Sequence, residues 1–166
     1  MNEPSRMHRK DREVTEKSRL LEALDSCQFG FLAMAEAGRP YVVPMSFVRS
    51  GNCLFFHTGA VGTKLDFIAA SPRVSFAAVP HAEYLKGKCD FSFLSVVVDG
   101  VARVILEKEE KTKAYKLLIA KFEGSPDAYP LNEKCVEGSC IICLEIWRIF
   151  GKENHGQIDT HNPNSK

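Results

Sequence analysis

The stretch Phe55-Phe56-His57-Thr58-Gly59-Ala60-Val61-Gly62-Thr63-Lys64-Leu65-Asp66-Phe67-Ile68 decides the fold of this chain, because it predicts a strand that turns directly into a helix. The apolar and aromatic residues from Cys53 to His57 are typical of a strand. Two glycines then indicate a turn, and apolar residues at helical spacing follow until Pro72 ends the helix. A helix that begins near Gly62 directs free N–H groups and the positive end of its dipole towards the turn.

Polar side chains at this turn suit an anion. Thr58 and Thr63 supply hydroxyl donors, and Lys64 supplies a positive charge. The turn is not a P-loop, because the interval from Gly59 to Lys64 is too short and no Ser or Thr follows the lysine. The residues alone leave two interpretations open, a phosphate site or an ordinary turn with a solvated lysine.

Length and composition indicate one domain of ordinary globular type. The chain has 166 residues, of which 45% are hydrophobic and 26% charged. A net charge of +1 gives no electrostatic case for a nucleic-acid or membrane partner. No apolar run approaches the ~20 residues of a membrane helix, and residues 1–17 lack the apolar core of a signal peptide. We therefore expect a cytoplasmic protein.

The six cysteines are expected to be reduced thiols in that compartment. Cys140 and Cys143 have the C-x2-C spacing of a zinc or redox pair. They lie in a predicted strand, however, where residues three apart point to opposite faces. We therefore expect no metal site.

Six strands and two or three helices are predicted, mostly joined by short turns. Pro44 cannot donate to a sheet ladder, so its strand is expected at an edge or at a bulge. The pattern predicts a mainly β protein, an antiparallel barrel with peripheral helices. We expect one domain over residues 1–151, which includes a charged arm at 1–13, and a polar tail at 152–166. The predicted strands cover 29–35, 41–48, 53–58, 73–79, 93–106 and 139–150. One helix is expected over 15–26 with Thr15 as its cap, a second directly after Gly62, and a third over 107–122. Loops are expected over 80–92 and 123–138.

Four motifs in this order resemble those of the pyridoxamine 5′-phosphate oxidase-like split-barrel flavoproteins, over about residues 8–150. The resemblance is strongest to the branch related to nitroimidazole-resistance, nitroreductase-type proteins. The motifs are Gly38-Arg39-Pro40-Tyr41-Val42-Val43-Pro44-Met45, the stretch from Leu54 to Lys64, Ser71-Pro72-Arg73-Val74-Ser75-Phe76, and Ser95-Val96-Val97-Val98-Asp99-Gly100-Val101-Ala102.

The resemblance implies a six-stranded split barrel that forms a homodimer, with FMN at the subunit interface. Thr58, Thr63 and Lys64 match positions that bind the FMN phosphate. The backbone of the strand with Val43, Pro44, Met45 and Ser46 matches the one that lies along the isoalloxazine ring. His57 matches a position beside the flavin.

Two of these residues keep a second interpretation from the sequence. His57 is a candidate for proton delivery to flavin or substrate, or a structural histidine at a strand end. Trp147, the only tryptophan, is a candidate for stacking on the cofactor or a core residue. It lies in Glu145-Ile146-Trp147, which resembles an R-x-E-x-W signature, although Cys143 stands where that signature has Arg.

The function implied is that of a flavin-dependent oxidoreductase, which passes electrons from a reduced nicotinamide to a small acceptor such as a nitro-aromatic compound. Thr63 stands where the oxidase itself has Arg, which argues against pyridoxamine phosphate as substrate. The alternatives are a non-catalytic protein that binds flavin or haem, with His57 or His81 as haem ligand, and a scaffold that has lost its cofactor.

Overall fold

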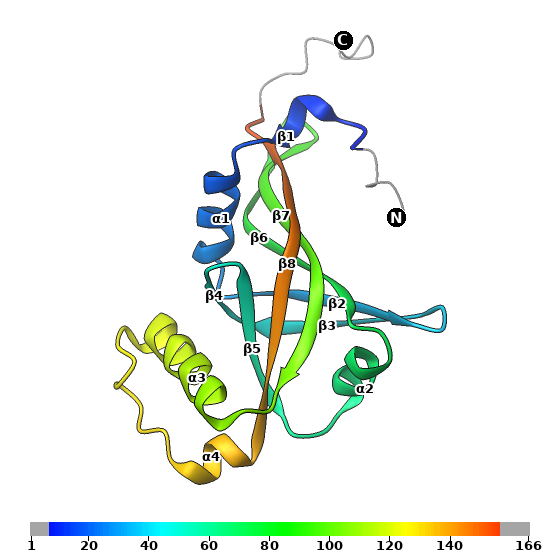
Figure 1. Cartoon of the computed structure of the whole chain (residues 1–166). Helices are drawn as coiled ribbons and strands as arrows, with labels where there is room; N and C mark the ends of the chain where they lie inside the picture. Colours follow the sequence, from blue (N-terminus) through cyan, green and yellow to red (C-terminus); the bar gives the residue numbers. More distant parts are fainter. Residues whose placement is uncertain (1–6, 157–166) are drawn as a thin grey trace.

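A single antiparallel sheet organises the computed structural model, which describes residues 7–156 (Figure 1). The strand order is β3-β2-β6-β7-β8-β5-β4, and the short β1 pairs with β8 outside this path. The elements are η1 (Lys10–Arg12), β1 (Glu13–Val14), α1 (Lys17–Ser26), β2 (Phe29–Glu36), β3 (Arg39–Ser46), β4 (Val48–Ser50), β5 (Cys53–Gly59), α2 (Thr63–Ala70), β6 (Arg73–Leu85), β7 (Asp90–Ile105), α3 (Lys108–Glu123), α4 (Glu133–Glu137) and β8 (Ser139–Asn154).

The sheet rolls up because its two outermost strands are neighbours in the chain. β3 and β4 stand at opposite ends of the strand order, yet only Phe47 separates them. Phe47 is fully buried, with its ring centroid 4.8 Å from that of Phe76 and 6.3 Å from that of Phe56. These rings fill the barrel interior, and such aromatic pairs contribute about 0.5–1.5 kcal/mol each beyond the area they bury. The mainly β split barrel is thus confirmed, and Pro44 lies in an edge strand as expected.

A second apolar cluster lies outside the barrel, between the sheet and α3. Tyr115 and Leu118 of α3 pack there with Val136 of α4 and with Ile141 and Cys143 of β8. Strand β8 therefore buries side chains on both faces, which explains its long apolar run.

The predicted loop over 80–92 is wrong, because this segment continues β6 and begins β7. The two strands form a long hairpin that pairs as far as Leu85 with Asp90, with a bulge between Ala78 and His81. On the β6 side of its distal half, most side chains are exposed on both faces, so the sequence carries no alternating pattern there. The short helix expected as an option in 123–138 is present as α4.

The ends of the described chain also differ from expectation. β8 ends at Asn154 rather than Phe150, so three residues of the predicted tail belong to the sheet. The described part of the charged arm is ordered: β1 pairs with Lys152 and Gly151. Thr15 does not cap α1, whose N-cap is Glu16 without a side-chain bond. Residues 1–6 and 157–166, predicted as arm and tail, lie outside the described residues.

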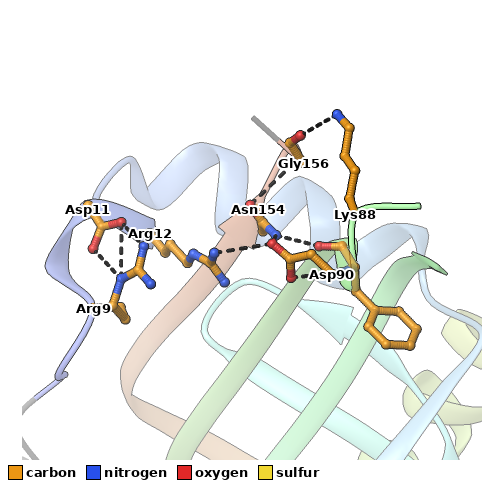
Figure 2. A network of polar contacts seen from close by, with 8 residues as sticks. Arg9, Asp11, Arg12, Lys88, Asp90, Asn154 and Gly156 are labelled. Atoms are coloured by element: carbon orange, nitrogen blue, oxygen red, sulfur yellow. Dashed lines mark hydrogen bonds and ion pairs between the residues drawn. The ribbon is translucent and has the colours of Figure 1, made fainter. Parts of the chain in front are cut away.

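A polar network joins these ends to the β6–β7 hairpin (Figure 2). Arg12 Nη2 lies 3.4 Å from Asp90 Oδ2, and Asn154 Nδ2 donates to the same oxygen at 2.9 Å. Asn154 Nδ2 also donates to the carbonyl of Phe91 at 2.5 Å. Lys88 Nζ donates to the carbonyl of Gly156 at 2.8 Å. The network ties three segments that are far apart in the sequence.

Among the described helices, none is long and apolar enough to cross a membrane.

Candidate functional site: an anion corner and an edge strand

The residues of the predicted anion corner lie where β5 ends and α2 begins. Lys64 Nζ donates to Thr58 Oγ1 at 3.0 Å, and Thr58 is only 6% exposed. The ammonium group is therefore held at the corner, while the rest of Lys64 remains half-exposed. The pairing of Lys64 with a neutral hydroxyl leaves its positive charge available to an anion.

The helix N-terminus contributes to the same corner. Gly62, the N-cap of α2, has a φ of 143°, a conformation that side chains rarely adopt, and no side chain caps the helix. The first-turn N–H groups therefore receive no side-chain acceptor. Thr63 lies exposed at the first helical position. Asp66, also in the first turn, is the one group here whose charge opposes anion binding.

The edge strand β3 presents backbone rather than side chains. β3 pairs with β2 alone, so every second residue directs its N–H and C=O away from the sheet. Met45 is buried, and Val43 packs against the barrel core. Pro44 and Ser46 point outwards and are exposed. These residues can therefore bind a planar group through free backbone groups, as the resemblance implies.

His57 lies on the face of β5 opposite to Thr58, beneath α3. Its ring centroid is 5.4 Å from that of Tyr115, at an interplanar angle of 57°. Loss of solvent under α3 lowers the pKa of His57 below its ordinary value, although part of the ring stays exposed. The imidazole is therefore mainly neutral at pH 7. Ser46 and His57 line one pocket of about 240 Å³ together with residues of α3.

Trp147 is not a core residue. β7 pairs Asp99 with Arg148 but Gly100 with Ile146, so Trp147 is the extra residue of a β-bulge in β8. Its side chain is 57% exposed, and the Arg73 guanidinium lies 5.4 Å from its ring centroid. Both line a second cleft of about 500 Å³ on the outer face of β2, β6, β7 and β8.

Polar groups at the base of this cleft hold one another. Ser75 Oγ donates to Asp99 Oδ1 at 2.6 Å, and Arg148 Nε lies 3.7 Å from Asp99 Oδ2. The cleft contains none of the other predicted cofactor-binding residues.

One chain does not bring the predicted site residues into one place. Thr58 pairs with Cys140, which precedes Trp147 by seven residues on β8. At about 3.3 Å per residue, the anion corner and Trp147 are therefore roughly 20 Å apart along the strand. The structure joins Thr58 with Lys64, and Ser46 with His57, but it separates Trp147 from both pairs.

Six pocket residues were not among the predicted site residues: Tyr115, Leu118, Ile119, Phe122, Glu123 and Tyr129. A signal for four of them was present, because Tyr115, Leu118, Ile119 and Phe122 share one face of an amphipathic helix. The helical spacing shows that another part of the protein covers this face, but it does not identify which element does so. Tyr129 lies in the loop after α3, which carries no periodic signal.

The cysteines do not form a metal centre in the part of the chain that the structure describes. No group of three His, Cys, Asp or Glu side chains is placed to hold a metal ion within residues 7–156. Cys143 is buried while Cys140 is half-buried on the opposite face of β8. Burial, followed by the interaction with the neighbouring Cys53 thiol, raises the pKa of Cys143 to about 12.

This architecture is that of a split barrel, and sequence comparison identifies its family. The model of the pyridoxamine 5′-phosphate oxidase family matches residues 16–153, so the chain belongs to that family. A search of curated protein sequences finds no match.

Solved structures with the same fold include flavin and haem proteins. A candidate 5-nitroimidazole antibiotic resistance protein from Bacteroides thetaiotaomicron superposes with a TM-score of 0.75 at 21% identity, over 84% of this chain and 85% of that one. An FAD- and haem-binding protein from Mycobacterium smegmatis gives 0.76 at 19% identity, over 87% and 74%. An FAD-binding protein from Mesorhizobium loti gives 0.65 at 24% identity, over 86% and 97%. At these identities the likeness establishes the fold alone.

Proposed function

We propose that this protein binds FMN and acts as a flavin-dependent oxidoreductase, which transfers electrons from a reduced nicotinamide to a small acceptor such as a nitro-aromatic compound. The observation that carries the proposal is the anion corner, in which a lysine and an uncapped helix N-terminus converge beside an edge strand. FMN has a terminal phosphate and a planar ring with hydrogen-bonding edges, so it matches both halves of this arrangement.

The phosphate would be held by Lys64, by the hydroxyl groups of Thr58 and Thr63, and by the first N–H groups of α2. Such charge-assisted hydrogen bonds contribute about 1.5–3 kcal/mol each. Asp66 lies in the same helical turn and would repel a second phosphate group. The corner therefore suits a mononucleotide, which has a single phosphate.

The ring would lie along β3, where alternate residues within 43–46 direct backbone groups outwards that can bond its polar edge, although Pro44 has no N–H to donate. Bound flavin itself supplies hydride and single-electron chemistry, so the protein needs few reactive side chains. His57, with its lowered pKa, is mainly neutral at pH 7 and can donate its ring N–H to a carbonyl or nitro oxygen. Leu118 and Phe122 of α3 would restrict water on that side.

We also propose that the protein acts as a homodimer in the cytoplasm. Trp147 lies too far from the anion corner of its own chain to touch the same cofactor. It is also exposed, as are the apolar side chains of Phe29, Phe31 and Val42 on β2 and β3. Exposed apolar groups on adjacent strands favour a protein interface. A second copy would bring Trp147 to the flavin and cover these side chains.

A haem-binding protein without turnover is the second candidate. The solved relative from Mycobacterium smegmatis binds both FAD and haem, and a neutral imidazole such as that of His57 is a common metal ligand. Haem would produce a Soret band on addition, without oxidation of a reduced nicotinamide.

Titration of the purified protein with FMN tests the first proposal. We expect the Lys64→Ala variant to raise the FMN dissociation constant about tenfold or more, because a charged hydrogen bond is lost. Lys86→Ala, in the exposed turn of the β6–β7 hairpin, is the matched control and is expected to bind as the parent does. Equal affinity of the parent and Lys64→Ala, or no FMN binding by the parent, would contradict the proposal.

A further inference from the structure

A pocket between α3 and the edge of the barrel has walls suited to a positively charged ligand. We propose that this pocket, lined by Ser46, His57, Tyr115, Phe122, Glu123 and Tyr129, binds a small aromatic cation. Its volume of about 240 Å³ accommodates one substituted ring.

Aromatic side chains surround the pocket from three elements. Tyr115 and Phe122 project from α3, Tyr129 from the loop after it, and His57 from β5. Phe122 and Tyr129 are 42% and 56% exposed, which leaves ring surface available to a ligand. The faces of such rings attract an organic cation by about 0.5–2 kcal/mol, depending on how far it is desolvated. Leu118 and Ile119 provide an apolar floor for the uncharged part of the ligand.

The charged groups at the pocket also favour a positively charged ligand. Among the described residues that line it, Glu123 is the one with a full charge at pH 7, because the lowered pKa of His57 keeps the imidazole mainly neutral. Glu123 is also the last residue of α3, whose cap Gly124 bonds the carbonyl of Ala120 at 3.0 Å. The carbonyl end of a helix carries partial negative charge. A carboxylate and a helix C-terminus therefore act together on whatever enters.

The nearby cations of α3 are directed elsewhere. Lys121 Nζ donates to the carbonyl of Cys27 at 2.6 Å and lies 4.1 Å from the centre of the Phe47 ring, and it is 5.8 Å from the centre of the Phe122 ring. Lys116 Nζ lies 3.2 Å from Asp127. Neither lysine lines the pocket. The ammonium group of Lys121 is held by a carbonyl outside the pocket, whereas the carboxylate of Glu123 lines the pocket directly, so the pocket favours cations over phosphates and carboxylates.

The placement of this cation beside a flavin rests on the proposed function. Ser46 and His57 belong both to the pocket and to the set expected to contact FMN. A ring bound there would lie next to the flavin rather than in its place. The electron acceptor would then be a cationic heteroaromatic compound rather than a phosphorylated one.

Calorimetric titration with three compounds that share a phenyl ring tests the charge preference. Benzyltrimethylammonium, benzyl alcohol and phenylacetate are titrated into the full chain with and without saturating FMN. We expect the ammonium compound to bind at least about fivefold more tightly than the alcohol, and phenylacetate to bind more weakly than either.

Variants separate the contributions of charge and ring. Glu123→Gln is expected to raise the dissociation constant of the ammonium compound about three- to fivefold, as for a partly exposed ion pair, and to leave that of the alcohol unchanged. Phe122→Leu is expected to reduce the preference for the cation by a similar factor. Glu109→Gln, at the far end of the same helix, removes the same charge outside the pocket and is expected to change neither value.

The outcomes are distinguishable from those of the FMN titration. Equal binding of the three compounds, tightest binding of phenylacetate, or an unchanged constant in Glu123→Gln would overturn the proposal. So would displacement of the cation by FMN, because the pocket would then be the flavin's own. If the parent fails to bind FMN but keeps the cation preference, the proposed function is wrong while the inference about the pocket stands.

Discussion

Gly100 allows β7 and β8 to approach each other at the bulge that presents Trp147. A Cβ built on Gly100 would lie 2.1 Å from the carbonyl oxygen of Glu145, which belongs to the backbone and cannot rotate away. The sequence predicts one continuous strand through Gly100, and the register between β7 and β8 shifts between Asp99 and Gly100. The sequence did not reveal that the bulge lies in β8, because a bulged residue is defined by a partner strand far away in the chain.

The Gly100→Ala variant is expected to lose about 3 kcal/mol of stability, since the added methyl group overpacks against backbone. For a chain of this size the loss corresponds to a fall in Tm of roughly 6–12 °C. Gly59→Ala is the control, because its nearest new contact would be at 3.8 Å. Scanning calorimetry of both variants tests this prediction. Equal Tm values would contradict the close approach of β7 and β8 at Gly100.

Thiol labelling should separate the cysteines by burial. Cys89 and Cys135 are exposed, whereas Cys143 is buried with a pKa of about 12. Because the thiolate is the reactive form, iodoacetamide at pH 8 is expected to modify the two exposed cysteines in the native protein and Cys143 only after unfolding. Peptide mass spectrometry measures each site. Modification of native Cys143 at the rate of Cys89 would show that β8 is not packed as described.

At the scale of elements, the sequence predicted best where local and tertiary signals agree. The β5–α2 unit has an apolar strand, two glycines and a helical repeat in succession, and the structure places Thr58 and Lys64 in contact at the turn between strand and helix. The distal half of the β6–β7 hairpin was not predicted, because on its β6 side neither face is buried. The pocket under α3 could not be predicted from the sequence, since it depends on which helix face meets which strand.

The docking of α3 involves a polar contact as well as apolar packing. The Tyr115 hydroxyl bonds Ser139 Oγ at the start of β8, and Ser139 Oγ donates to the carbonyl of Cys135 at 2.5 Å. The Tyr115→Phe variant is expected to be destabilised by about 1 kcal/mol, because the bond is lost while the ring remains. Urea unfolding measures the difference. Tyr84→Phe, on the exposed hairpin, is expected to unfold as the parent does, and equal stability of both variants would exclude a contribution from this contact.

At the scale of the whole molecule, one carboxylate joins three distant segments. Asp90 begins β7, Arg12 lies in η1, and Asn154 ends β8 (Figure 2). The backbone N–H of Phe91 and the Asn154 amide, followed by Arg12, hold the pKa of Asp90 below its ordinary value. A carboxyl group whose pKa is lowered by folding stabilises the fold above its unfolded pKa of about 3.9, and this contribution disappears as the pH falls through the folded pKa.

The Asp90→Asn variant is therefore expected to be less stable than the parent at pH 7, with a difference that narrows as the pH falls below about 4. Urea midpoints measured from pH 7 to pH 3 test this dependence. Glu83→Gln, on the exposed part of β6, serves as the control for removal of a charge. A difference that is constant with pH would show that the network contributes through geometry alone.

The same network places both ends of the described chain at one pole of the barrel, while α3 and α4 lie at the other (Figure 1). A linker or fluorescent reporter attached near residue 7 or residue 156, the limits of the described chain, would therefore start on the side remote from the aromatic pocket. Immobilised protein should keep that pocket open to small molecules whichever end is tethered.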